Sequence, residues 1–139
     1  MNARTTPART VPRDEHGQLL FDVFDRACPS RHVLEHVTSR WGLLALAALR
    51  DGEARFSALR RRVDGISEKM LSQTLQTLER DGFVHRAAQA TIPPRVDYSL
   101  TPLGREVADK LVDLIEHLEG RMPLVTTAQD EYDEARAAR

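Results

Sequence analysis

The stretch ISEKMLSQTLQTLER, residues 66–80, has the apolar spacing of an amphipathic helix. At about 100° per residue, its apolar face collects Met70, Leu71, Thr74, Leu75 and Leu78. The opposite face collects Lys69, Ser72, Gln73, Gln76 and Arg80. Amides, hydroxyls and cations are the side chains that bond base edges and phosphates in DNA. We therefore interpret this helix as one that reads a major groove. A solvated face that happens to carry Gln and Ser is the alternative.

A shorter helix is predicted directly before this stretch. Phe56, Leu59 and Val63 mark its apolar face, and Asp64 with Gly65 forms the turn that follows. Ser67 is the expected N-cap of the second helix. Arginines line the outside of the first helix at positions 55, 60, 61 and 62. Two short helices joined by a glycine-containing turn make the helix-turn-helix pattern.

Two strands are predicted after the helix-turn-helix, at residues 83–90 and 95–100. The second strand alternates strictly, so that its expected inward side chains are Val96, Tyr98 and Leu100. Its expected outward side chains are Arg95, Asp97 and Ser99. The loop between the strands, TIPP, cannot pair in a sheet and must project. A hairpin that projects from the end of a reading helix is a wing, with Arg86 and Arg95 available to phosphates.

The helices on either side supply the core and the contacts between subunits. Pro29 is expected to open a helix that turns Val33, Leu34 and Val37 inward. Residues 40–49 are apolar nearly all round, which predicts a central buried helix anchored by Trp41. Before them, Leu19, Leu20, Val23 and Phe24 have the spacing of a short amphipathic turn or two. This piece is too short to fold alone, so we expect it to pack on something, such as a second subunit.

The final helix, residues 102–119, carries an apolar stripe. Its members are Leu103, Val107, Leu111, Leu114 and Leu118. Such a stripe at the edge of a small domain needs a partner, and the simplest is the same helix of another copy. Folding back on its own domain is the alternative. We therefore predict a homodimer whose interface includes Leu20, Phe24 and this stripe. The fold class is mainly α with a small β-hairpin wing (α+β), that is, a winged helix-turn-helix dimerised through its terminal helices.

Composition sets the limits of the chain. Its 139 residues suffice for one domain at 17–122, between a flexible N-terminal arm at 1–16 and a polar acidic tail at 123–139. The net charge of −1 divides into 0 for residues 1–39, +4 for 40–95 and −5 for 96–139. A basic middle fits a polyanion such as double-stranded DNA. Without a long apolar run or a secretory signal, we expect a cytoplasmic protein with no membrane partner.

The chain has few residues that suit metal binding or catalysis. One cysteine excludes an internal disulfide and a multi-cysteine zinc site. His32 and His36 have helical metal-pair spacing, but no third ligand is placed to complete a site. No catalytic pairing and no glycine-rich phosphate loop is present. We predict no metal, no cofactor and no enzymatic activity.

Five blocks together resemble the HxlR family of bacterial winged-helix transcription regulators. They are CP at 28–29, RWGLLALAAL at 40–49, RFSALRR at 55–61, GISEKMLSQTLQTLERDGFVHR at 65–86 and PPRVDYSLTPLGRE at 94–106. The resemblance covers about residues 28–118 without interruption. It implies a homodimer whose two recognition helices enter successive major grooves. Where many members have a lysine before the tryptophan, this chain has Arg40, which would take over any phosphate contact.

The resemblance also implies roles by position. Base contacts would fall to Ser67, Lys69, Ser72, Gln73 and Gln76. Backbone contacts would fall to Arg40, Arg55, Arg80, Arg86 and Arg95. Cys28 lies where some relatives carry a thiol that responds to oxidants or electrophiles. Arg26, Arg31 and the helix start at Pro29 would favour its reactive thiolate. A buried, inert cysteine is the alternative.

The predicted function is therefore a dimeric, sequence-specific DNA-binding regulator of a palindromic operator. An oxidant acting on Cys28 or a small-molecule effector would control it. The alternative keeps the fold but makes it a protein-interaction module without specific DNA binding. Such a module has no need for five arginines around one polar helix, so charge favours the regulator.

Overall fold

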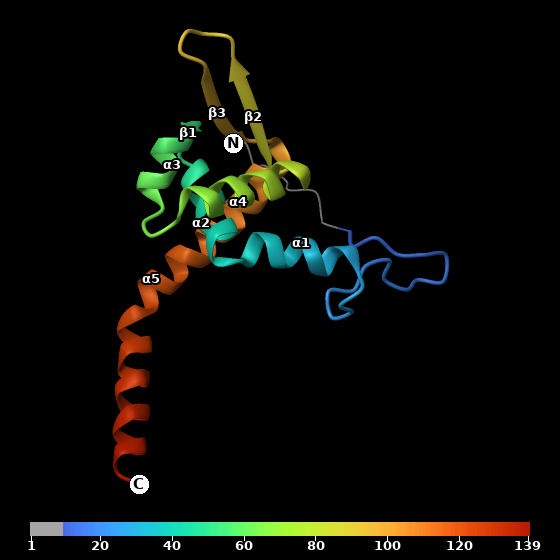
Figure 1. Ribbon diagram of the computed structural model, residues 1–139. Helices are drawn as coiled ribbons and strands as arrows, with labels where there is room; N and C mark the ends of the chain where they lie inside the picture. Colours follow the sequence, from blue (N-terminus) through green and yellow to red (C-terminus); the bar gives the residue numbers. More distant parts are fainter. Residues whose placement is uncertain (1–9) are drawn as a thin grey trace, which may run out of the picture.

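A computed structural model describes residues 10–139, and all positions below lie in that range (Figure 1). The elements follow the order α1 (Pro29–Thr38), α2 (Arg40–Leu49), β1 (Ala54–Arg55), α3 (Phe56–Arg62), α4 (Glu68–Arg80), β2 (Val84–Gln89), β3 (Arg95–Leu100) and α5 (Pro102–Ala137). The three strands form one antiparallel sheet in the order β1-β3-β2. The predicted fold class, a mainly helical winged helix-turn-helix with a hairpin wing, is confirmed. The predicted arm at 1–16 lies mostly outside the described residues.

The core forms where α2 crosses the other helices. The central α2 packs against α1, α4 and α5. Six leucines are fully buried there: Leu46, Leu49, Leu59, Leu71, Leu75 and Leu78. Three of them come from α4, so the apolar side of α4 packs this helix against the rest of the domain. Trp41 is half-buried against this cluster and does not anchor its centre.

Short polar side chains begin the helices at the positions that the sequence predicted. The Ser67 hydroxyl accepts a hydrogen bond from the Met70 N–H of α4 at 3.1 Å. The Thr101 hydroxyl accepts one from the Gly104 N–H of α5 at 3.0 Å. Each bond satisfies one of the amide groups that lack a partner in the first turn of a helix. Pro29 occupies the first turn of α1, as expected.

Two features of the sheet differ from the prediction. Strand β1 was not predicted, because two residues are too few to show an alternating pattern; Ala54 pairs with Tyr98. The predicted solvent exposure of Asp97 is wrong, because its side chain is only 4% exposed. Asp97 bonds the Arg95 side chain on the same strand and the Gln89 side chain on the neighbouring strand, so neighbouring side chains shield its carboxylate from water.

The N-terminal segment, residues 10–28, forms turns and a single bridge between Arg13 and Leu19, without a helix. The predicted amphipathic turn at 19–24 therefore lacks regular structure. Leu19, Leu20 and Phe24 are exposed, with Phe24 at 90%, whereas Val23 is half-buried. In Figure 1 the segment extends sideways from the start of α1. Leu34 of α1, expected inward, is also exposed, whereas Val37 is buried.

The last helix is longer than predicted, and part of its apolar stripe packs in its own domain. Helix α5 runs for 36 residues, past Gly120 and Pro123, and takes in most of the predicted tail. Leu111 is buried in the core of its own domain, and Val107 packs against that core. Both residues therefore serve the core of their own domain, and a contact of the half-buried Val107 with another copy stays a prediction. Leu103, Leu114 and Leu118 remain about half exposed.

Candidate nucleic-acid interface

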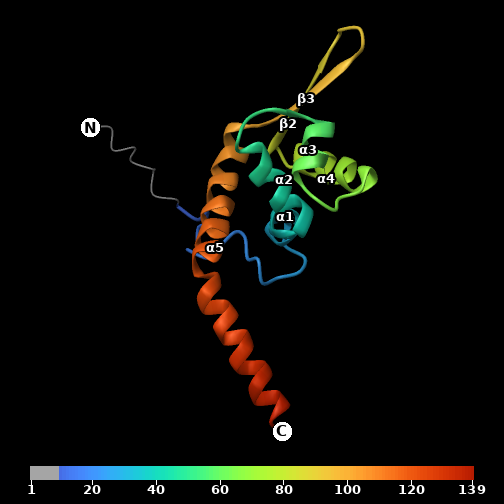
Figure 2. The same cartoon turned by 90° about the vertical axis from the view of Figure 1, so that its left-hand side faces the viewer.

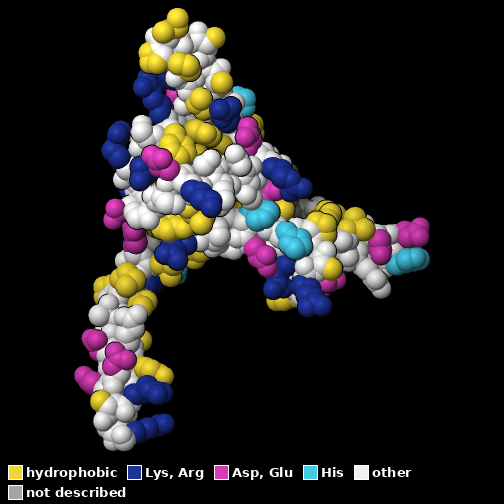
Figure 3. Space-filling view, viewed as in Figure 1, with side chains coloured by type: hydrophobic (Ala, Val, Ile, Leu, Met, Phe, Trp, Pro, Cys, Tyr) yellow, Lys and Arg dark blue, Asp and Glu magenta, His cyan; other side chains and the backbone are white. Residues whose placement is uncertain are grey.

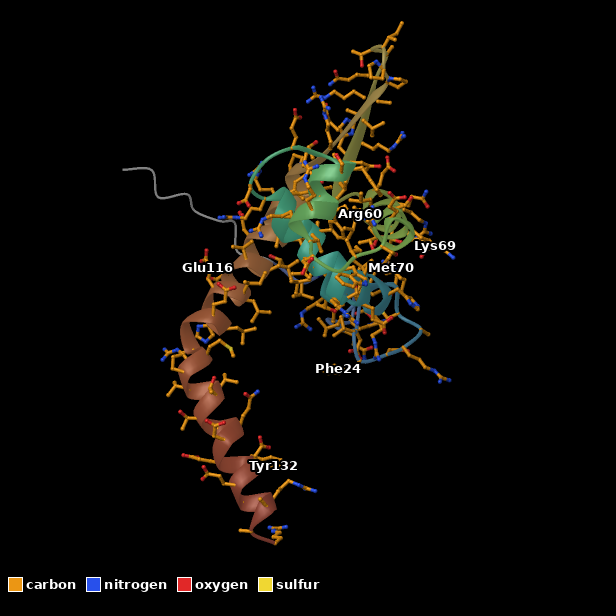
Figure 4. All side chains as sticks on the ribbon, turned by 60° about the vertical axis from the view of Figure 1, so that its left-hand side comes forward. Phe24, Arg60, Lys69, Met70, Glu116 and Tyr132 are labelled. Carbon is orange, nitrogen blue, oxygen red and sulfur yellow. The ribbon has the colours of Figure 1, made fainter. Side chains whose placement is uncertain are left out.

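Helix α4 presents a polar stripe outward because its three buried leucines turn the other side to solvent. Lys69, Gln73, Gln76 and Arg80 are exposed, and Ser72 is half-buried. Figure 4 shows Lys69 at the outer surface, on the side away from α5. Met70 was expected on the buried face but is 40% exposed. Both Met70 and the half-buried Thr74 line a shallow groove of about 260 Å³ between α1 and α4.

One predicted contact residue, Ser67, and one neighbouring arginine, Arg60, already make structural contacts in the helix-turn-helix. Ser67 caps α4, so its oxygen accepts from the Met70 N–H, and its hydroxyl proton stays available to donate. Arg60 of α3 donates to Glu68 in the first turn of α4 at 3.0 Å, which joins the two helices across the turn. Arg55, Arg61 and Arg62 are exposed beside it.

The end of α4 is tied to α1 by a pair that the sequence analysis missed. Nδ1 of His36 lies 2.6 Å from Oδ2 of Asp81, the residue that caps α4. The Asp81 side chain is only 6% exposed, so the contact is largely shielded from water. The two residues are 45 positions apart, and no local pattern joins them. This pair therefore joins the C-terminal end of α4 to α1.

The wing carries an arginine whose position is fixed by the buried carboxylate. Nε of Arg95 donates to Asp97 Oδ1 and Oδ2 at 3.0 and 3.1 Å. Nε2 of Gln89, on β2, donates to Oδ2 at 2.9 Å. The Arg95 side chain is nevertheless 42% exposed. Because only Nε is engaged, the terminal N–H groups of the guanidinium stay available to an anion.

The second wing arginine adjoins the polar stripe. Arg86 is exposed on β2 and lines a hollow of about 310 Å³ together with Ser72, Gln76 and Glu79 of α4. In Figure 3, Lys and Arg side chains surround the base of the wing and continue across the helix-turn-helix, with acids interspersed. The arrangement places neutral amides and hydroxyls beside cations on one surface. This is the composition that base reading combined with phosphate contact requires.

Arg40 lies apart from this stripe, at the start of α2. Its guanidinium carbon is 4.8 Å from the centroid of the Trp41 ring. A cation stacked on an aromatic face gains a modest attraction and keeps its outer N–H groups free. Arg40 therefore keeps the charge that the predicted phosphate contact needs.

Cys28 occupies the N-cap position of α1 and is half-buried. Its sulfur lies 3.2 Å from the Ser30 hydroxyl and accepts from the Asp22 N–H at 3.3 Å. These hydrogen bonds lower the pKa of the thiol, against smaller opposing effects of its partial burial and of the nearby Asp25. The lowered pKa does not come from the arginines expected to act on the thiol, and Arg31 instead pairs with Glu35. Ser30 and Asp22 therefore lower the pKa of this thiol, and its reactivity stays a prediction.

A separate hollow of about 500 Å³ lies beside the contact of α2 with α5 and is lined by residues of α2, α3 and α5. Its floor is apolar, and its rim carries Arg50, Arg62 and several acids. Arg50 donates to Asp109 of α5 at 2.8 Å, and this contact raises the pKa of the guanidinium. Because the rim carries both positive and negative side chains, it indicates no particular class of ligand. Control by a small-molecule effector stays a prediction.

Residues 10–139 contain neither a metal-binding cluster nor a membrane-spanning helix. No group of three or more His, Cys, Asp or Glu side chains in this part of the chain could hold a metal ion. No helix there is long and apolar enough to cross a bilayer.

Comparison with known proteins gives consistent matches. The family model described as HxlR-like helix-turn-helix matches residues 36–124. YtfH, an HTH-type transcriptional regulator of Escherichia coli, is 54% identical over 110 residues, which is 79% of this chain and 87% of the relative. The solved structure of the transcriptional regulator ytfH from Salmonella typhimurium is 54% identical, with a TM-score of 0.75, and the match covers 79% of this chain and 98% of that one.

A second solved structure adds information about regulation. The redox regulator HypR in its oxidized form is 34% identical with a TM-score of 0.62, and the match covers 67% of this chain and 96% of that one. Residues 125–139 lie beyond the family match. They include the distal end of α5, which the comparison with the family model therefore does not explain.

Proposed function

The chain belongs to the HxlR-like helix-turn-helix family of transcriptional regulators, and we propose that it binds a palindromic operator as a homodimer. In each copy, α4 reads bases while the wing and neighbouring arginines hold phosphates. Base contacts are assigned to Lys69, Ser72, Gln73 and Gln76, with Ser67 donating its remaining proton. Phosphate contacts are assigned to Arg40, Arg55, Arg80, Arg86 and Arg95.

One observation carries this proposal. The amides of α4 are exposed next to a wing arginine, whereas the leucines of the same helix are fully buried. Gln pairs with adenine edges and Lys with guanine acceptors, and each bidentate contact discriminates against the wrong base by about 1–3 kcal/mol. A surface with no partner would not need a fixed guanidinium such as that of Arg95, whose Nε is bonded to a buried carboxylate.

Selection of duplexes from a random pool, followed by salt titration, tests the proposal. The selected site should contain two inverted half-sites about one helical turn apart. Ten phosphate contacts per dimer would give a slope of log affinity against log salt of about −9 as an upper limit. A flat salt response together with no enriched sequence would instead support the protein-interaction module.

Control through Cys28 is the second part of the proposal. Its support is the lowered pKa of the thiol and the relative that is a redox regulator. A thiolate is the form that attacks oxidants and electrophiles. An oxidant should change operator affinity in the parent protein and leave Cys28→Ser unaffected. If oxidant changed the operator affinity of both proteins equally, Cys28 would not be the residue on which the oxidant acts.

A further inference from the structure

The distal half of α5 extends away from the rest of the described chain in both cartoon views (Figures 1 and 2). Between residues 120 and 137 every side chain is exposed except that of Val125, which is half-buried. The segment contains Gly120 and Pro123 inside the helix. Both residues disfavour a helix, and an isolated helix of this length is marginal in water. An uncovered helix of this composition therefore needs a partner to stay ordered.

A seven-residue apolar repeat runs along this helix. Its seam, with alternating steps of four and three residues, is Leu111, Ile115, Leu118, Met122, Val125, Gln129 and Tyr132. The first of these is buried in the domain core, so the seam leaves the domain there and continues onto the free helix. Such a spacing, averaging about 3.5 residues, is the signature of a left-handed coiled coil. Tyr132, near the end of the seam, is 61% exposed (Figure 4).

Most residues outside the seam in the distal half are polar, and Leu124, 64% exposed, is an apolar exception. The distal acids lie off it, at Asp130, Glu131, Asp133 and Glu134. Pro123 also lies on the outer side, where a missing N–H and a slight bend do not obstruct a neighbouring helix. The helix thus has one apolar edge and one acidic side, as a helix in a two-stranded coil requires.

We propose that this distal half of α5 forms a parallel, in-register coiled coil with the same segment of a second copy. The inference rests on the homodimer of the proposed function and adds a contact that the family match does not include. Ile115 followed by Leu118 is the order of branched and unbranched side chains that favours two strands in a parallel coil. Gln129 is the polar seam residue that fixes register, since its amide pairs with its own copy.

Charge also permits self-association in this arrangement. In a parallel coil, residues that flank the seam also meet across the two helices. The residue directly before every second seam residue lies opposite the residue five positions further along the partner helix. Arg121 then faces Thr126 of the partner subunit, and Ala128 faces Asp133 of the partner subunit. Neither pairing brings like charges together, so no repulsion opposes a second copy.

The position of the two helix-turn-helix units, called the two heads below, selects the parallel orientation. The helix-turn-helix lies at the N-terminal end of α5, which is about 54 Å long at 1.5 Å per residue. An antiparallel coil would hold the two heads at opposite ends. A parallel coil holds them side by side, as two half-sites roughly 34–36 Å apart require. The distal coil therefore fixes the orientation of the two heads on one duplex.

Disulfide trapping in the full-length chain tests the proposal. The parent for this experiment is Cys28→Ser, which removes the natural thiol. Tyr132→Cys is then placed in the seam, and the matched control Glu134→Cys lies two residues away on the outer side. Both positions are exposed, so neither substitution disturbs the core. Mild oxidation should convert Tyr132→Cys to a covalent dimer and leave Glu134→Cys mainly uncrosslinked.

Adding Val125→Asp to the Tyr132→Cys protein should abolish the cross-link, because it places a charge in the seam. Equal cross-linking of the two cysteine variants, or none in either, would overturn the coil. Sedimentation and operator binding of the reduced Tyr132→Cys protein separate the two proposals. A dimer that binds its operator but does not cross-link at 132 refutes only the coil. A monomer without operator binding refutes the proposed function as well.

Discussion

Replacing Gly104 with alanine should destabilise the domain, although alanine is the better helix former. An alanine Cβ at this position would lie 1.8 Å from the backbone oxygen of Phe83 and 2.7 Å from its carbonyl carbon. The same oxygen accepts the Thr101 N–H at 3.1 Å, so it cannot simply turn aside. The first turn of α5 would have to move off the strand that begins the wing.

The size of the effect follows from two opposing contributions. Overpacking typically costs about 1–3 kcal/mol, and a clash with backbone belongs at the upper end. Removing a helical glycine returns at most about 1 kcal/mol. The net loss of unfolding free energy is then about 2 kcal/mol, which lowers the melting temperature of a chain of this length by about 7 °C.

Gly120 provides a control in the same helix, because an added Cβ there meets nothing within 4 Å. Gly120→Ala should leave stability unchanged or raise it by up to about 1 kcal/mol. Thermal and urea unfolding followed by circular dichroism measures both variants. If Gly104→Ala were as stable as Gly120→Ala, the close seating of α5 on Phe83 would be wrong.

Three further predictions concern charged groups and the thiol. Arg95→Ala should lower the affinity for all duplexes alike. It should also lower the free energy of unfolding by about 1–3 kcal/mol, because buried Asp97 loses a donor. Arg86→Ala should lower DNA affinity and leave stability unchanged. Urea unfolding and filter binding compare the two, and equal stability would contradict the role of the carboxylate. His36→Ala should cost about 1–3 kcal/mol by leaving a buried carboxylate without its partner, again measured by urea unfolding. Because the thiolate of Cys28 is favoured, its alkylation rate should rise with pH at a midpoint below that of a free cysteine in an unfolded peptide; coincident midpoints would contradict the hydrogen-bond account.

The helix-turn-helix could be predicted because its information is local. The spacing of Leu71, Leu75 and Leu78 sets which side of α4 is buried, and Ser67 marks where that helix starts. Helix α2 begins and ends where its apolar run does. In both cases neighbouring positions in the sequence are also neighbours on one helix face, so periodicity is sufficient.

Features that depend on distant contacts could not be predicted in this way. Asp97 has an outward place by alternation, yet it is buried because Arg95 and Gln89 bond its oxygens. His36 and Asp81 meet only after the domain has folded. The apolar spacing of α5 was correctly found, but periodicity alone could not say that Val107 and Leu111 serve the core of their own domain.

The central claim is that α4 reads bases while the wing holds phosphates. The measurement that tests it most directly is the ratio of operator to random-duplex affinity for Gln76→Ala and for Arg86→Ala. We predict that Gln76→Ala lowers this ratio by about 1–3 kcal/mol per lost bidentate contact, whereas Arg86→Ala lowers both affinities and keeps the ratio. The same change of ratio in both variants would contradict this division of roles.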